Sequence, residues 1–159
     1  MGIFVIAFTA TGKTSLARNY KNVIDMESTK YKYLGECSEN LKSTNRDINN
    51  DWPNNYFKAL NSVRDKYDYI LVADEIVNDF LVKNNYEYWI VYPQKELKEE
   101  YLKRCEIRGN NAEFIYWYSK LWDQWIDSCK NDKHASKCIE LASNQYLEDV
   151  LPNLKKENY

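Results

Sequence analysis

The residues with the clearest chemical potential lie near the amino end, where residues 7–14 are Ala-Phe-Thr-Ala-Thr-Gly-Lys-Thr. The phosphate-binding pattern is G-x-x-x-x-G-K-[ST] between a strand and a helix, and this stretch departs from it only at Ala7. In that pattern Gly12 lets the backbone approach phosphate oxygens, Lys13 supplies positive charge, and Thr14 supplies a hydroxyl ligand for Mg²⁺. We therefore expect a nucleoside triphosphate to bind here with Mg²⁺. The expected contacts are Ala7, Thr9, Ala10, Thr11, Gly12, Lys13, Thr14 and Ser15.

The elements that must position this stretch alternate between short apolar runs and helical segments, which favours an α/β fold with a parallel sheet. Strands are expected at 2–7, 22–26, 69–73, 86–92 and 137–142. Helices are expected at 13–20, 54–67, 75–84, 94–108, 112–130 and 145–151. The aromatic helix at 112–130 repeats apolar residues every three or four positions, which predicts a face that packs on the sheet. These residues are Phe114, Trp117, Leu121, Trp122 and Trp125.

Acidic side chains follow two of the expected strands. Asp25 and Glu27 lie at the end of the second strand, where a carboxylate could accept a proton from a hydroxyl or hold the water shell of a metal. The alternative for both is a turn or helix cap. Asp74 ends the third apolar run, where it could bind Mg²⁺ or cap the following helix. With Glu75 beside it to polarise water, Asp74 also leaves open a motor or switch ATPase.

Two arginines lie four residues apart in the expected helix at 94–108. Arg104 and Arg108 therefore emerge on one helical face, where they could stabilise charge on a transferring phosphoryl group. The alternative pairs Arg104 with Glu100 on a solvated helix.

With these residues in place, the chain resembles the small P-loop kinases, the group of the nucleoside monophosphate, shikimate and gluconate kinases. The likeness covers nearly the whole chain in element order, and its specific motif is the stretch at 7–14. It implies one domain over 1–159, with a five-stranded parallel sheet flanked by helices, an acceptor-binding insert at about 28–53 and a lid at about 94–111. The base of the bound nucleotide would lie near Asn144. The implied catalytic residues are Lys13, Asp25, Arg104 and Arg108. The implied acceptor contacts are Glu27, Tyr31, Tyr33, Arg46 and Trp52.

The resemblance implies transfer of the γ-phosphate of ATP to a small acceptor. Aromatic and basic side chains in the segment 28–53 favour a (deoxy)nucleoside monophosphate as that acceptor. A hydroxyl acceptor such as a nucleoside, sugar or polyol stays open, with Asp25 as the base. A P-loop ATPase or a nucleotide-binding module without an acceptor is the third alternative.

Composition narrows the remaining classes of function. The formal net charge is −2 and no dense Lys/Arg cluster is present, which disfavours a nucleic-acid polymer as partner. The apolar run at 3–8 is too short to cross a bilayer, and no basic leader precedes it. The four cysteines show no CxxC spacing and only one histidine is present, so we expect no zinc site and a cytoplasmic protein.

Overall fold

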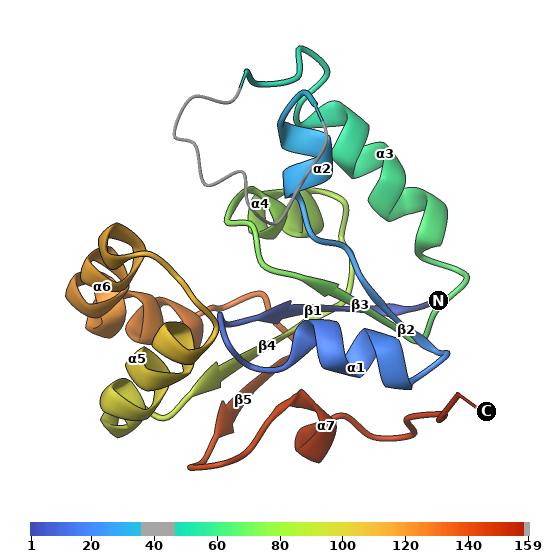
Figure 1. Cartoon of the computed structure of the whole chain (residues 1–159). Helices are drawn as coiled ribbons and strands as arrows, with labels where there is room; N and C mark the ends of the chain where they lie inside the picture. The colour runs from blue at the N-terminus through green and yellow to red at the C-terminus, as the bar shows by residue number, and fades with distance from the viewer. Residues whose placement is uncertain (36–46, 158–159) are drawn as a thin grey trace.

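Five parallel strands form the centre of the computed structural model, which describes residues 1–35 and 47–157 (Figure 1). The strands are β1 (Ile3–Ala7), β2 (Val23–Asp25), β3 (Tyr69–Val72), β4 (Tyr88–Pro93) and β5 (Lys137–Leu141), in the order β2-β3-β1-β4-β5. All residues of β3 and β4 are buried, as expected for parallel strands covered on both faces. The predicted α/β class with a five-stranded parallel sheet flanked by helices is confirmed.

Helices cover both faces of this sheet. On one face lie α1 (Lys13–Asn19) and α7 (Leu147–Val150), which pack against β1, β3 and β4 through Leu16 and Leu147. The opposite face is covered by α3 (Asn54–Val63), α4 (Ile76–Lys83), α5 (Lys98–Ile107) and α6 (Ala112–Lys130). A short 3₁₀ turn, η1 (Lys95–Leu97), leads into α5, and α2 (Thr29–Lys32) lies in the segment 28–53, where no helix was expected. The carboxyl ends of the strands therefore meet one edge, to which α1, α2 and α5 are attached.

The aromatic helix α6 is rotated relative to the sequence-based expectation. Its buried residues are Tyr118, Trp122 and Ile126, whereas Trp117 is 47% exposed and Trp125 is 36% exposed. The prediction was right for Trp122 and wrong for Trp117 and Trp125. Apolar residues occupy two adjacent rows of the helix, and only the row spaced by four residues from Tyr118 is fully buried.

None of the helices among the described residues is both long and apolar enough to span a membrane.

Candidate functional site

The β1–α1 loop, residues 8–12, wraps over the amino end of α1. Gly12 precedes that helix with φ 93°, and a Cβ at this position would lie 3.2 Å from Cδ1 of Tyr146. The positive φ therefore favours glycine at this position, and any side chain here would require the neighbouring ring of Tyr146 to shift. Ala7, in contrast, ends β1 and is absent from the positive-φ residues of the described chain, so alanine fits where the motif has its first glycine.

Contacts from α6 and from the loop itself hold the first half of this loop. Phe8 meets Trp122 edge to face, with ring centroids 5.5 Å apart, and Tyr118 donates a 3.4 Å hydrogen bond to the Thr9 carbonyl. Thr11 is fully buried, and its hydroxyl donates to the Phe8 carbonyl at 2.7 Å. The loop is thus closed on itself and braced by the aromatic helix.

Lys13 lies at the first turn of α1 and is partly buried. Its Nζ donates long bonds of 3.4 Å to the carbonyls of Ala7 and Phe8, and it forms no ion pair within residues 1–35 and 47–157. Burial lowers the pKa of Lys13; the carboxylate of Asp25 opposes this effect and the positive charge of Arg108 adds to it. A partly desolvated cation at a helix amino end favours a bound anion.

Asp25, at the end of β2, faces the same helix turn. The Thr14 hydroxyl donates to Asp25 Oδ2 at 3.3 Å, while Asp25 Oδ1 is buried without a hydrogen-bond partner among the described residues. Burial raises the pKa of Asp25, although nearby Lys13 and the Thr14 hydrogen bond lower it. A hydroxyl and a carboxylate with an unused oxygen make a donor set that suits a hard divalent cation.

The other two predicted carboxylates take the capping roles that the sequence left open. Asp74 accepts bonds from Ser28 Oγ at 3.0 Å and from the Ile76 amide at 3.2 Å, so it caps the first turn of α4. Glu27 accepts from the amide and hydroxyl of Thr29, at 2.9 and 2.6 Å, and so caps α2. The charges of Asp74, Glu27 and Asp25 add to burial in raising the pKa of Tyr56, which places all three acids on one side of the site.

A cavity of about 410 Å³ opens on the other side, between the β1–α1 loop and α5. It is lined by Ala10, Thr11, Gly12, Lys13, Thr14, Ser15, Arg104, Ile107, Arg108 and Tyr146. Arg108 is exposed there, and its side chain makes no ion pair with other described residues. Arg104 is only 12% exposed and pairs with Glu100 at 2.8 Å, which is the alternative pairing offered by the sequence.

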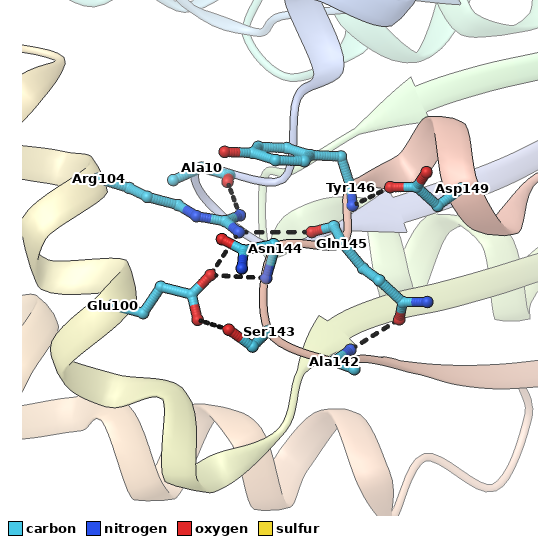
Figure 2. Close-up of polar contacts among 9 residues, drawn as sticks. All are labelled: Ala10, Glu100, Arg104, Ala142, Ser143, Asn144, Gln145, Tyr146 and Asp149. Carbon is cyan, nitrogen blue, oxygen red and sulfur yellow. Dashed lines mark hydrogen bonds and ion pairs between the residues drawn. The ribbon is translucent and has the colours of Figure 1, made fainter.

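The loop after β5, residues 142–146, contributes Tyr146 to the lining of this cavity. Figure 2 shows the contacts between this loop, Glu100 and Arg104. The Tyr146 ring lies over the Arg104 guanidinium at 4.1 Å, and the Leu147 amide donates to the Thr11 carbonyl at 3.0 Å. Asn144 is exposed, and its backbone N–H donates to the Glu100 carboxylate at 2.9 Å. The sequence predicted that this loop lies near the nucleotide base, but it indicated neither the position of Tyr146 nor the contact of Glu100 with this loop.

The predicted acceptor-binding residues lie apart from this cavity. Tyr31 and Trp52 pack around the buried Tyr56, with ring centroids 5.2 and 5.6 Å from it. Tyr33 forms an isolated antiparallel bridge with Ile48. Arg46 lies outside the described residues. None of the described members of this set lines the 410 Å³ cavity, so the site has a basic side at α5 and an acidic, aromatic side at the ends of β2 and β3.

A scan against protein-family models found no match, and no curated protein sequence matches the chain. Function is therefore inferred from the geometry of the site.

Proposed function

We propose that this chain is a P-loop phosphotransferase that binds ATP with Mg²⁺ at the β1–α1 loop and moves the γ-phosphate to a small acceptor. The observation that carries the proposal is the state of Lys13. Its ammonium group is partly buried at the amino end of α1, makes only two long carbonyl contacts with the described residues, and borders the 410 Å³ cavity. Phosphate oxygens are the ligands that such a cation and the free amides of a helix start accommodate best.

The residues around Lys13 support a division of roles. Lys13 and Arg108 would face the phosphates, since both line the cavity and neither has an ion-pair partner among the residues described. Thr14 and Asp25 fit the metal, because Asp25 Oδ1 is buried and unpartnered beside the Thr14 hydroxyl. Bound Mg²⁺ would neutralise charge on the terminal phosphates. Asp74 would act from farther out, through Ser28.

The acceptor has two candidates. A nucleoside monophosphate is the first, and it relies on Arg46 and on the aromatic side chains of the segment 28–53. A hydroxyl acceptor is the second, and a specific observation favours it. Asp25 has an unused buried oxygen and a raised pKa, which are the properties of a group that accepts a proton.

A screen of acceptors tests the proposal. Purified protein with Mg²⁺ and ATP would be incubated with nucleoside monophosphates, nucleosides and small polyols, and ADP formation would be compared with that of Lys13→Ala. Acceptor-dependent ADP formation that is lost in the variant supports a kinase. Equal hydrolysis with and without acceptors indicates an ATPase, and tight binding without turnover indicates a binding module. Absence of both MgATP binding and turnover would overturn the proposal.

A further inference from the structure

We propose that Glu100 and Arg104 form a bracket that couples the loop of residues 142–146 to the β1–α1 loop. Through this bracket, the base side and the phosphate side of a bound nucleotide would be recognised together. The inference rests on the proposed nucleotide binding and adds two positioning residues to it. In this view Arg104 shapes the site, and Arg108 is the arginine that meets phosphate.

Arg104 is fixed by partners in three segments of the chain. Its guanidinium donates to the Ala10 carbonyl at 3.0 Å, to Glu100 at 2.8 Å and to the Gln145 carbonyl at 3.5 Å (Figure 2). It also contacts the rings of Tyr101 and Tyr146, whose centroids lie 4.3 and 4.1 Å away. A planar fork with several donors used and aromatic rings against it is held in one orientation.

Glu100 provides the other half of the bracket. One carboxylate oxygen accepts from the Asn144 amide at 2.9 Å, and the other accepts from the Ser143 hydroxyl at 2.9 Å. Asn144 has a φ of 60°, a left-handed conformation that asparagine adopts more readily than most other non-glycine residues and that exposes its backbone amide to Glu100. Glu100 does not line the 410 Å³ cavity. It therefore acts on the shape of the 142–146 loop rather than on a ligand.

The two loops that the bracket joins also meet each other directly. Tyr146 follows the bracketed residues and sets its ring against Gly12. Ala10, whose carbonyl receives the Arg104 bond, has a φ of 63°. A change in either loop would thus disturb charge-assisted hydrogen bonds that the other loop shares, which is the physical basis of coupling.

Binding measurements on Glu100→Gln test the coupling, with Glu99→Gln as the matched control. Glu99 is the exposed neighbour on the same helix and has no part in these contacts. The affinities of MgATP and of magnesium tripolyphosphate would be measured by calorimetry, together with kcat and KM for the four nucleoside triphosphates. For Glu100→Gln we expect about tenfold weaker MgATP binding, the effect of one charge-assisted hydrogen bond. Tripolyphosphate affinity and kcat should stay within about threefold of the wild-type values, and the variant should discriminate less between the four bases.

A second variant guards against a simple folding defect. Arg104→Lys keeps the charge but loses the planar fork, so it should lower base selectivity in the same way, and thermal unfolding would verify that both variants fold. If wild-type protein binds MgATP and Glu100→Gln binds it with the same affinity, the bracket is overturned and the proposed function stands. Equal weakening of MgATP and tripolyphosphate, or a fall in kcat alone, would also overturn it. Failure of the wild-type protein to bind either ligand would instead overturn the proposed function, and the bracket with it.

Discussion

The nucleotide side and the acceptor side of the proposed site differ in how fully their polar groups are paired. On the nucleotide side, Arg104 has three hydrogen-bond partners and Glu100 joins it to the loop after β5. On the acceptor side, Asp25 keeps a buried oxygen without a partner. Polar groups that are fixed in advance need no reorganisation when a ligand arrives, whereas an unpaired buried oxygen calls for a partner from outside. We infer that the base end of the nucleotide subsite is preorganised, whereas its phosphate end, where the Arg108 side chain has no ion-pair partner among the described residues, and the acceptor subsite are completed by their ligands.

The largest expected effect falls on the acceptor side and distinguishes the two candidate acceptors. With a hydroxyl acceptor, Asp25→Asn should reduce kcat by about 10²–10⁴-fold and leave acceptor binding nearly unchanged, because a general base is lost. Glu27→Gln is the control, since Glu27 caps α2 and should matter little. Steady-state kinetics with the best acceptor from the screen provides the measurement.

The opposite pattern would identify a monophosphate acceptor. Arg46→Ala would then raise the acceptor KM while Asp25→Asn would have the smaller effect, because a phosphate acceptor needs charge compensation more than a base. Such a result would show that Asp25 serves the metal rather than the acceptor.

A somewhat smaller effect is expected on the nucleotide side. Lys13→Ala should lower kcat by about 10²–10³-fold, the range typical for losing one electrostatic stabiliser of the transition state. The fold should persist, because Lys13 is anchored only by two long carbonyl bonds. Turnover and thermal unfolding would be measured beside Lys21→Ala, an exposed lysine beyond the end of α1. Unchanged turnover in Lys13→Ala would remove the phosphate-loop interpretation.

Hydrogen exchange can compare the two sides directly. MgATP alone should slow exchange several-fold in residues 7–20, 100–108 and 142–146, where the nucleotide subsite is built. Residues 28–35 and 47–53 should gain protection only when the acceptor is also present, because ligand-driven closure excludes water at that stage. If MgATP alone protected both sides equally, the contrast between them would be lost.

The smallest expected effect is a pH-dependent contribution of Glu100 to stability. Hydrogen bonds, led by that from the Asn144 amide, lower the pKa of Glu100 below its ordinary value of 4.5. A lowered folded-state pKa means that the stabilisation is fully present above the unfolded-state pKa of 4.5 and is lost as the pH falls through the lower, folded-state pKa. Urea unfolding should therefore show wild-type protein about 1 kcal/mol more stable than Glu100→Gln at pH 7, with the difference shrinking as the pH is lowered below 4.5. A difference that stayed constant as the pH fell would show that the carboxylate charge is not its source.

The sequence predicted the parts of this molecule that depend on local patterns. The five strands were found within two residues of their ends, since buried parallel strands appear as short apolar runs such as 69–72. The β1–α1 loop was found because its glycine and lysine have fixed spacing. The fourth strand, expected at 86–92, instead extends to Pro93.

Local sequence patterns could not predict how the helices are rotated against the sheet or which residues distant in sequence are in contact. The exposure of Trp117 depends on how α6 is rotated against the sheet, and apolar spacing alone does not fix that angle when two rows are aromatic. The contact of Glu100 with Asn144 joins residues 44 positions apart, and it follows only from the placement of α5 beside the end of β5. Tyr146 could have been singled out as the aromatic residue in the loop already assigned to the base.

The closure of the β1–α1 loop by late residues has a consequence for how the protein is made. Thr11 receives a hydrogen bond from Leu147, and Gly12 is covered by Tyr146. A loop near the amino end of the sequence is therefore completed by residues near its carboxyl end. On the ribosome, β1 and α1 emerge long before these partners do. The nascent chain must therefore carry an unfinished β1–α1 loop until α7 has been synthesised, and contacts of such high sequence separation form slowly.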